Sequence, residues 1–308
     1  MKILVTGSRG TLGTPLCTEL ARRGHEVWGC DLQHHEGDRY LRADVSSFRQ
    51  LERALEHIGP DVVYHLAAEF GRLNGEQYYD TLWATNVIGT KNILELQNLN
   101  RFKLVFASSS EIYGECPERI LSEDLSEKRP LRQLNEYAIS KYVSEQQILN
   151  AAERYGTESV ICRFFNAYGP GEHYHPYRSV VCLFCHHALN GLPWTVYEGY
   201  NRVFMYITDF IPTLATVCER YRAGEIYNIG GAEYRSVREL SDLILELTDA
   251  RPDLVTSMPE DHHNVVSKRP DISKAKRDLD HGPRVTLEEG VPETLEWMAQ
   301  YCHPHLRM

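Results

Sequence analysis

The chain has 308 residues, enough for one large α/β domain or two smaller ones, and its 42% hydrophobic and 25% charged residues are typical of a soluble globular enzyme. The formal net charge of −10 argues against a nucleic-acid partner, because a phosphate backbone requires a basic face. No apolar run is long enough to span a bilayer. Eight cysteines without framework spacing, and an N-terminus that enters a strand at once, predict a cytoplasmic protein.

The first two-thirds of the chain alternate apolar strands with helices. Strands are expected at "KILVTG", "HEVWGCD", "DVVYHLA", "FKLVFASS" and "ESVICRFFN". Helices are expected near 12–23, 47–57 and 78–97, and from about Tyr137 onward. Because helices of this length separate the strands, the pattern predicts an α/β fold with a doubly wound parallel sheet of the Rossmann type.

After Tyr168 the pattern loosens into the Gly-, Pro-, His- and Tyr-rich stretch "YGPGEHYHPYRS". The strand "EIYNIGG" returns to the sheet, and the helices "SVRELSDLILELT" and "TLEEGVPETLEWMAQY" close the chain. We therefore expect a Rossmann domain in residues 1–167, with a later return near 203–231. Residues 168–202 and 232–308 should form a smaller substrate-binding lobe, with a cleft between the two.

The segment "CLFCHH", Cys182–His187, contains the C-x-x-C-H pattern of haem attachment and could also suggest zinc. A second cysteine pair at matching spacing is absent from the sequence. The surrounding "SVVCLFCHHALNG" has the composition of an apolar helix ending at Gly191. We therefore expect a structural helix here and no metal site.

The first strand and first helix are joined by "TGSRGTLG", which places Gly7, Gly10 and Gly13 at G-x-x-G-x-x-G spacing. Glycines there permit a tight turn and let the backbone approach a pyrophosphate at the helix N-terminus. The second strand ends in Asp31, whose carboxylate can bind adenosine ribose hydroxyls and repel a 2′-phosphate. Asp44, after "YLRAD", is a candidate for the adenine edge. Either aspartate alone could be a helix cap, but together with the glycines they indicate a dinucleotide site.

Arg9 favours NADP instead, because a cation inside the glycine turn can bind a 2′-phosphate. Leu32 and Gln33, which follow Asp31, offer no second cation. The sequence therefore predicts NAD as the cofactor and leaves NADP open.

"NEYAISKY" places Tyr137 and Lys141 four residues apart, on one face of a helix. A nearby ammonium lowers the pKa of a phenol, so such a tyrosine can act as a base near neutral pH. The pattern Y-x-x-x-K alone is frequent by chance. Its combination with the glycine turn and the serine-ended strand that precede it is not.

With these elements the sequence resembles the extended short-chain dehydrogenase/reductase family, the nucleotide-sugar epimerases and dehydratases. The resemblance covers essentially the whole chain and includes "HLAA", "TNVIGT", "SSSEIYG", "YAISK", "RFFNAYGPG", "RVFMYITD" and "RPDISKAK". It implies an NAD-dependent enzyme that transiently oxidises the sugar of a nucleotide-diphosphate sugar at C4. It also implies a homodimer formed through the Y-x-x-x-K helix and the helix before it. The apolar residues Leu82, Trp83, Tyr142 and Ile148 are expected on the exposed side.

The resemblance also assigns roles. Tyr137 would take the proton from the sugar hydroxyl, Lys141 would hold the nicotinamide ribose, and Ser109, beside Ser110, would hydrogen-bond the same hydroxyl. The expected cofactor contacts are Gly7, Arg9, Gly10, Thr11, Leu12, Gly13, Asp31, Leu32, Asp44, Val45, Leu66, Ala67, Ala68, Asn86, Tyr137, Lys141 and Phe164. The expected substrate contacts are Glu69, Arg72, Asn74, Asn166, Arg202 and Arg269.

Glu111 directly follows the serines. By resemblance, simple 4-epimerases carry a small or apolar residue there, whereas GDP-mannose 4,6-dehydratase and UDP-glucuronate decarboxylase look like "TSE". Once C4 is a ketone, the protons at C3 and C5 become acidic, and Glu111 is a candidate to move one. The alternative is a solvated or ribose-binding carboxylate.

Two departures from the family pattern bear on the substrate. Asp261 stands where many relatives carry a second phosphate-binding arginine. Lys268 stands where decarboxylases carry a catalytic arginine, so decarboxylation stays open as an alternative but is not favoured. Two other classes stay open: an NAD-binding regulator that has lost catalysis, and a conventional dehydrogenase that releases NADH. The intact Ser109, Tyr137 and Lys141 argue against the regulator.

Overall fold

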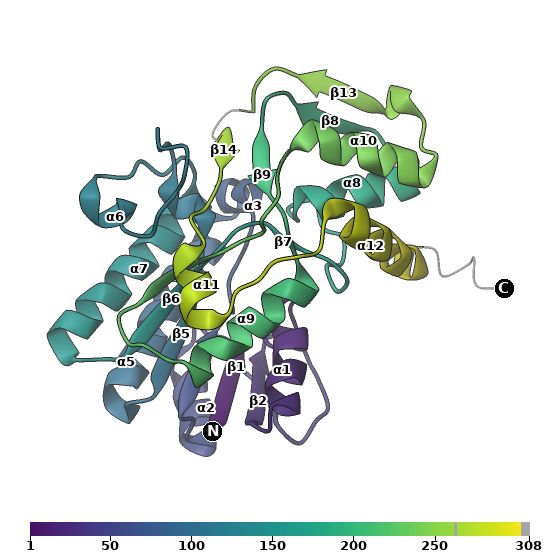
Figure 1. The fold of residues 1–308 in the computed structure, drawn as a ribbon. Coiled ribbons are helices and arrows are strands. Elements are labelled where there is room, and N and C mark those ends of the chain that lie inside the picture. The colour runs from purple at the N-terminus through teal and green to yellow at the C-terminus, as the bar shows by residue number, and fades with distance from the viewer. Residues whose placement is uncertain (262–263, 303–308) are drawn as a thin grey trace.

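The centre of the fold is a seven-stranded parallel sheet (Figure 1). The structure is a computed structural model that describes residues 1–261 and 264–302. The sheet comprises β1 (Lys2–Thr6), β2 (Glu26–Asp31), β3 (Tyr40–Arg42), β4 (Val62–His65), β5 (Lys103–Ser109), β6 (Ser159–Phe164) and β11 (Ile226–Ile229). Their order is β3-β2-β1-β4-β5-β6-β11, which reverses direction at β1 and β4. This confirms the doubly wound sheet that the sequence predicts.

Helices cover both faces of the sheet (Figure 1). The helices of the first part of the chain are α1 (Gly13–Arg22), α2 (Phe48–Ile58), α3 (Arg72–Gln77), α4 (Tyr79–Trp83), α5 (Gly89–Asn100), α6 (Leu125–Lys128) and α7 (Glu136–Tyr155), followed later by α9 (Ile207–Glu219). The π-helical turn η1 (Ala84–Ile88) lies inside the helix expected near 78–97. The 3₁₀ turn η2 (Ser110–Tyr113) follows β5. α1 packs against α9, and α5 packs against both α2 and α7.

The alternation of side chains along the buried strands creates two hydrophobic cores. In β1, Ile3 and Val5 join a core with Leu16 of α1, whereas Leu4 joins a second core with Leu51 of α2. Successive residues of a strand point to opposite faces, so a strand covered on both sides must be apolar throughout. This is why the central strands are continuous apolar runs in the sequence.

The remaining elements of the chain lie mostly at one end of the molecule (Figure 1). They are β7 (Ala167–Tyr168), α8 (Val180–Leu189), β8 (Trp194–Tyr197), β9 (Asn201–Val203), β10 (Met205–Tyr206), β12 (Tyr234–Ser236), α10 (Val237–Thr248), η3 (Pro252–Leu254), β13 (Val255–Met258), β14 (Ser267–Lys268), α11 (Ser273–Leu279) and α12 (Leu287–Cys302). The strands pair as β12-β9-β14, β10-β7 and β13-β8. α8 packs against α10 and α12.

The division into a Rossmann domain and a second lobe remains a proposal. β11 and α9 lie within or against the large sheet, as the predicted return near 203–231 requires. α11, which the sequence division assigns to the second lobe, packs against β11 and α9 instead. The helices α8, α10 and α12 agree with the helices expected from the sequence.

The C-x-x-C-H segment lies in α8, which confirms the expected helix. Cys182 and Cys185 are buried in the larger hydrophobic core. Across the part of the chain that the structure describes, no group of His, Cys, Asp or Glu side chains could hold a metal ion. Over the same residues, no helix combines the length and apolarity needed to cross a bilayer.

Two of the residues expected on an exposed dimer face are buried. Leu82 is 0% exposed and Ile148 is 2% exposed, because both side chains pack into the interior of the chain. Trp83 and Tyr142 are half-buried. The exposed apolar residues on these helices include Tyr79, Ile88, Leu99 and Leu149 instead.

Candidate active site

The first cavity lies where the strand order reverses, at the carboxyl ends of β1, β2, β4 and β5, and has a volume of about 340 Å³. We call it the strand-end cavity. Doubly wound sheets bind their ligands at this place. Most of the predicted cofactor residues line it: Gly7, Gly10, Thr11, Leu12, Gly13, Asp31, Leu32, Asp44, Val45, Leu66, Ala67, Ala68, Tyr137, Lys141 and Phe164.

The glycine turn forms one wall of this cavity. Gly7 has a φ of 70°, and a Cβ added there would lie 2.7 Å from the backbone nitrogen of Ala67. A Cβ added at Gly13 would lie 2.1 Å from the carbonyl oxygen of Gly7. Only glycine fits these two positions, and the turn leads directly into the N-terminus of α1. This backbone therefore fits a pyrophosphate.

Asp31 is held at the end of β2 by backbone groups. Its Oδ2 accepts a hydrogen bond from the backbone N–H of Arg9 at 2.9 Å, and its Oδ1 accepts one from the backbone N–H of Gln33 at 3.2 Å. Asp44 also lines the cavity, and its Oδ1 accepts hydrogen bonds from the backbone and hydroxyl of Ser46. A fixed carboxylate beside the glycine turn suits an unphosphorylated ribose, so these residues fit NAD.

Two predicted cofactor residues do not line the strand-end cavity. The side chain of Arg9 is exposed and lines a separate hollow beside Tyr40, because the turn directs it away from the sheet end. Asn86 is 2% exposed, and its amide is used internally. It accepts a hydrogen bond from the backbone N–H of Glu69 and donates to the Glu69 carbonyl and the Ser140 hydroxyl. Asn86 therefore supports the loop after β4.

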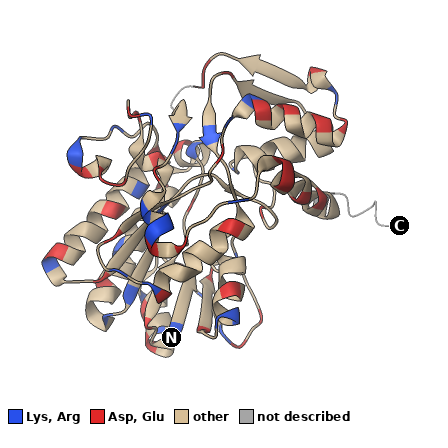
Figure 2. Cartoon of the chain, in the orientation of Figure 1, with Lys and Arg blue, Asp and Glu red and all other residues tan. Residues whose placement is uncertain are grey.

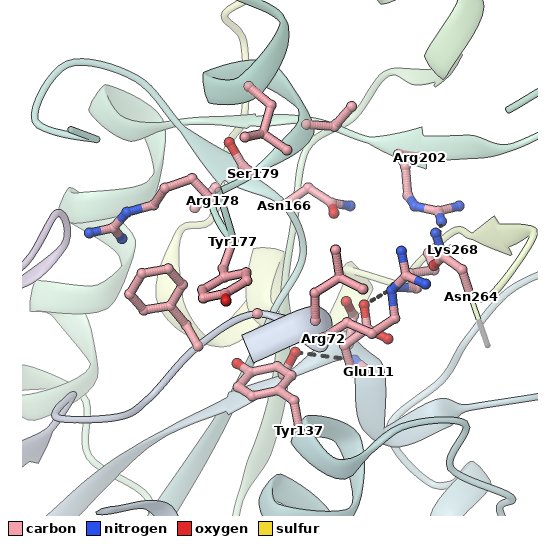
Figure 3. Close-up of a pocket in the computed structure, with 18 of the residues that line it drawn as sticks. Arg72, Glu111, Tyr137, Asn166, Tyr177, Arg178, Ser179, Arg202, Asn264 and Lys268 are labelled. Carbon is pink, nitrogen blue, oxygen red and sulfur yellow. Dashed lines mark hydrogen bonds and ion pairs between the residues drawn. The ribbon is translucent and has the colours of Figure 1, made fainter. Parts of the chain in front are cut away.

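The second cavity, about 480 Å³, is lined by residues from both parts of the chain (Figure 3). We call it the lobe cavity. Seven residues line both cavities, so the two are contiguous: Thr11, Leu12, Phe70, Ser108, Tyr137, Phe164 and Arg178. The predicted residues that line the lobe cavity are Arg72, Ser109, Ser110, Glu111, Tyr137, Asn166 and Arg202.

Three predicted substrate residues lie outside the lobe cavity. Glu69 lines the strand-end cavity, and its carboxylate accepts a hydrogen bond from Asn74 Nδ2 at 3.0 Å. Asn74 also donates to the carbonyl of Phe70, so its amide fastens the loop after β4. Arg269 is exposed, with its guanidinium 5.6 Å from the ring centre of Tyr234. It follows the inward-pointing Lys268 in extended backbone, where successive side chains point opposite ways.

Tyr137 stands at the wall shared by the cavities, near the start of α7. Burial raises the pKa of its phenol to about 12, against the lowering effect of the Ser109 hydroxyl. Burial also lowers the pKa of Lys141 to about 8, although the Glu145 carboxylate raises it. The Lys141 ammonium donates to the carbonyl of Ala107 at 2.8 Å. Burial therefore outweighs the lowering of the Tyr137 pKa that the sequence predicts.

A buried network fixes the position of Lys141 on α7. One turn further along the helix, Glu145 is 1% exposed and pairs with Arg163 of β6, with Oε2 and Nη2 2.8 Å apart. Ser108 of β5 donates to the same carboxylate. Arg163 in turn donates to Tyr113, whose hydroxyl donates to Asn228 at 2.7 Å. Helix α7 is thus joined to β5, β6 and β11 by buried polar contacts.

Glu111 and Lys268 form an ion pair inside the lobe cavity (Figure 3). Lys268 is 2% exposed, and burial lowers the pKa of its ammonium to about 8 against the raising effect of Glu111. Burial raises the pKa of Glu111, but Lys268, Arg202 and Arg72 outweigh it and hold this pKa below its usual value. The second oxygen of Glu111, Oε2, is buried without a hydrogen-bond partner among the described residues.

The other charged residues of the lobe cavity form a chain of contacts. Arg72 of α3 and Asp261 form a two-fold hydrogen-bonded ion pair at 2.9 and 2.7 Å. Asn264 donates to Asp261 Oδ2 at 2.7 Å, and its own Oδ1 accepts from Arg202 at 3.0 Å. Asn166, with a φ of 41°, donates to the carbonyl of Val203. Asp261 therefore neutralises the charge of Arg72.

The sequence-based site list omitted several lining residues. In the strand-end cavity these are Cys30, Gln33, Ala43, Phe70, Thr85, Ala107, Ser108 and Arg178. In the lobe cavity the polar ones include Glu172, Tyr177, Arg178, Ser179, Thr195, Tyr197, Tyr200 and Asn264. Most of the latter belong to 172–200, where glycines, prolines and short elements leave no periodic pattern that could have identified them.

Comparisons with known proteins agree with this geometry. The sequence model of the NAD dependent epimerase/dehydratase family matches residues 3–230. UDP-N-acetyl-alpha-D-glucosaminuronate decarboxylase of Bacillus cytotoxicus is 30% identical over 320 residues, covering 97% of this chain and 98% of its own. UDP-glucose 4-epimerase of Thermotoga maritima, solved with UDP-glucose, has a TM-score of 0.88 at 26% identity, covering 98% and 99% of the chains. MoeE5, solved with UDP-glucuronic acid and NAD, has a TM-score of 0.87 at 28% identity, covering 98% and 100%.

A doubly wound sheet with a dinucleotide cavity and a Tyr137–Lys141 pair defines an NAD-dependent enzyme of the short-chain dehydrogenase/reductase type. The chain belongs to the NAD dependent epimerase/dehydratase family. This confirms the family resemblance, the NAD cofactor and the enzymatic character that the sequence predicts. The alternative hypothesis of a catalytically silent regulator is therefore dropped.

Proposed function

We propose that this protein oxidises a nucleotide-diphosphate sugar at C4, with the hydride passing to the cofactor, and moves a second proton while C4 is a ketone. The hydride then returns either to C4, which restores the alcohol, or to C6 after loss of water, which leaves a 4-keto-6-deoxy sugar. One observation carries the proposal. Ser109, Tyr137, Glu111 and Lys268 line a single cavity that is contiguous with the cavity fitting NAD. Similar proteins are a UDP-sugar decarboxylase and a UDP-glucose 4-epimerase, which supports a nucleotide sugar as the substrate class.

The charges of the lobe cavity support an anionic substrate. Four basic side chains and three acidic ones line it, although the whole chain carries a net charge of −10. The basic residues are Arg72, Arg178, Arg202 and Lys268; the acidic ones are Glu111, Glu172 and Asp261. Burial raises the pKa of Glu172, against the lowering effect of its hydrogen bonds with Ser179. Figure 2 shows basic residues on β9 and β14, the strands that carry Arg202 and Lys268.

In the first step, Tyr137 accepts the proton of the C4 hydroxyl, and Ser109 holds the same oxygen. When bound, NAD supplies the hydride acceptor. The ammonium of Lys141 stabilises the ionised phenol electrostatically, and it is fixed for this role by Ala107 and the buried network around Glu145. General-base catalysis of this kind contributes typically about 10²–10⁴-fold.

In the second step, Glu111 moves a proton at a carbon next to the ketone. Its Oε1 side is held by Lys268, whereas Oε2 has no partner among the described residues and is available to a substrate proton. Because Lys268 keeps the carboxylate ionised, Glu111 starts as the base.

The experiment that tests this function uses a panel of UDP-, GDP-, CDP- and dTDP-sugars in D₂O. The expected result is conversion of at least one sugar, with deuterium incorporated at C3 or C5. Conversion without deuterium incorporation would leave a plain C4 epimerisation and remove the second step. No conversion of any member of the panel would contradict the proposed substrate class.

Decarboxylation is the second candidate, and the contact that favours it is the Glu111–Lys268 pair. By resemblance, decarboxylases carry Glu and Arg at these two positions, and a decarboxylase of Bacillus cytotoxicus is a relative. A cation beside the cavity could bind a uronate, and a proton donor there could return a proton to C5 after CO₂ leaves. Release of CO₂ from UDP-glucuronic acid, faster in Lys268→Arg than in the wild type, would support this candidate.

Glu111→Gln separates a catalytic role from a binding role. The change keeps the shape and one oxygen but removes the base, so we expect deuterium incorporation to fall by about 10²-fold or more. The C4 ketone should accumulate and be trapped by borodeuteride. Glu172→Gln is the matched control, since Glu172 lines the same cavity but already accepts hydrogen bonds from Ser179. Normal deuterium incorporation in Glu111→Gln would refute the second step.

A further inference from the structure

A separate hollow lies beside the glycine turn, and it shares none of its described lining residues with the strand-end cavity or the lobe cavity. Its volume is about 380 Å³, and its walls come from the glycine turn, α1, β2 and the segment that leads into β3. Figure 1 shows α1 next to β2 at this edge of the sheet. We call it the α1–β2 hollow. It is therefore distinct from the site that the proposed reaction uses.

The charge of this hollow is positive. Of its described lining residues three are basic and none is acidic, and the basic ones are Arg9, His35 and Arg39. Within residues 1–261 and 264–302, the guanidinium groups of Arg9 and Arg39 form no ion pair and no hydrogen bond. The pKa of Glu26 is lowered first by a hydrogen bond from Trp28 Nε1 and also by the charge of Arg39. The hollow is thus a positive region on a chain whose net charge is −10.

A buried hydroxyl without a partner distinguishes this hollow from an ordinary group of exposed arginines. Ser8 is 4% exposed, and its Oγ has no hydrogen-bond partner among the described residues. A Cβ added at Gly29 would lie 2.7 Å from Ser8 Oγ, and both residues line the hollow. The hydroxyls of Thr14 and Thr18, in contrast, already donate to backbone carbonyls of the turn and of α1. A buried donor without a partner is costly, and a ligand that accepts its hydrogen bond removes that cost.

The basic residues stand on backbone that is already in place. The N–H of Arg9 donates to Asp31 Oδ2 at 2.9 Å, and the carbonyl of Arg39 accepts from the backbone of β2 at 2.8 Å. The ring of His35 packs edge-on against Tyr40, with 5.1 Å between the ring centres. Because these segments need not be ordered by a ligand, the cost of binding is reduced.

We propose that the α1–β2 hollow binds a phosphate group, either as free phosphate or as the phosphate of a small monoester. Arg9 and Arg39 would hold its oxygens, since a planar guanidinium suits two phosphate oxygens, and Ser8 would donate its free hydroxyl. The site is separate from the place of NAD, because Asp31 and Leu32 line the strand-end cavity and not this hollow. The inference does not depend on the proposed sugar substrate.

The experiment measures the dissociation constant of inorganic phosphate by phosphorus NMR, with NAD at saturating concentration and at low ionic strength. We expect a value of about 1 mM for the wild type. Arg39→Gln and Arg9→Gln should each weaken phosphate by about tenfold, and Ser8→Ala by about threefold. Arg49→Gln is the matched control, because it removes an exposed arginine of α2 that does not line the hollow. It should change the dissociation constant by less than about twofold.

A second probe separates the two sources of the phosphate group. AMP, titrated while NAD fills the strand-end cavity, carries the same group on a nucleoside. Binding of AMP that is tighter than that of phosphate, and is lost in Arg39→Gln, would support a monoester as the ligand. Equal or weaker binding of AMP would support free phosphate.

Three results would overturn the proposal. The first is unchanged phosphate affinity in Arg39→Gln, or an equal loss in Arg49→Gln, which would show only a general effect of charge. The second is displacement of phosphate by NAD, which would place the phosphate in the strand-end cavity. The third is displacement by NADP but not by NAD, which would assign the hollow to the 2′-phosphate of the cofactor. If Arg39→Gln does not fold, Arg39→Lys decides: it keeps the charge but loses the planar fork, so phosphate should weaken by about threefold, and wild-type affinity would contradict the proposal.

Discussion

The residues around Tyr137 show how burial modifies a sequence motif. Y-x-x-x-K spacing suggests that Lys141 lowers the pKa of Tyr137. In the structure the largest effect on both groups is burial, which raises the pKa of Tyr137 to about 12 and lowers that of Lys141 to about 8. Burial disfavours each charged form, so the phenolate requires further positive charge in the complete site.

Tyr137→Phe keeps the ring and removes the proton acceptor. We expect turnover to fall by about 10²–10⁴-fold, with NAD affinity within about threefold of the wild type. The turnover rate is measured by steady-state kinetics on the sugar identified by the panel, and the affinity for NAD is measured by calorimetric titration. A near-wild-type rate would remove Tyr137 from the mechanism.

Lys141→Met tests the pKa of the buried lysine through stability. The native pKa of about 8 lies below the unfolded value of 10.5, so between these pH values the unfolded state binds more protons than the native state. The contribution of Lys141 to stability therefore rises with pH across this window, by up to about 3 kcal/mol. We measure the free energy of unfolding by urea at pH 7.5 and 9.5. Relative to the wild type, the free energy of unfolding of the variant should fall as the pH rises. A stability difference independent of pH would contradict the shifted pKa.

At the scale of elements, the site depends on where strands end and helices begin. β1 leads into the glycine turn and α1, β2 ends in Asp31, and β5 ends in Ser109. Since the strands are parallel, their carboxyl ends meet at one edge of the sheet. α7 then brings Tyr137 and Lys141 to the same edge, fixed by the buried pair of Glu145 and Arg163.

The end of β2 sets the cofactor preference. In Asp31→Asn the like-charge repulsion of a 2′-phosphate is removed, and we expect the affinity for NADP relative to NAD to rise by about tenfold. Asp44→Asn is the control, because that carboxylate lines the same cavity but is bound to Ser46. Titrations of both cofactors decide the outcome. Tighter binding of NADP than NAD by the wild type would show that Asp31 does not set the preference.

At the scale of the whole molecule, the lobe cavity exists only where distant parts of the chain meet. Arg72 and Asp261, which are paired, come from α3 and from the segment between β13 and β14. Glu111 and Lys268 come from η2 and β14. Ion pairs therefore connect the two parts of the chain across the proposed substrate site.

Assembly into a homodimer remains a proposal at this scale. With Leu82 and Ile148 buried, the candidates for the interface are the exposed apolar residues of the same helices. They include Tyr79, Ile88, Leu99 and Leu149, which are 63%, 51%, 69% and 41% exposed. Light scattering at micromolar concentration should give twice the 35.5 kDa of one chain. Leu149→Glu should shift the mass toward the monomer, because it places a charge in an apolar contact. A monomeric wild type would contradict the dimer.

The sequence by itself determined the parallel sheet, the dinucleotide turn and the reactive edge. These depend on local patterns: buried strands are continuous apolar runs, Gly7 and Gly13 occupy positions that admit no side chain, and Tyr137 and Lys141 share one helical face. Each of these signals lies within a few residues, so it can be read without knowing the contacts between distant segments.

Only the tertiary structure decided which polar side chains face a cavity. Asn86 and Asn74 have the residue types of ligands but support the loop after β4, Arg9 and Arg269 are exposed, and Arg178 reaches both cavities. The pairing of Lys268 with Glu111 joins residues 157 positions apart. Such contacts depend on packing between short elements without periodic patterns, and on burial, which sets the pKa values and leaves Glu111 Oε2 and Arg178 Nε without partners among the described residues.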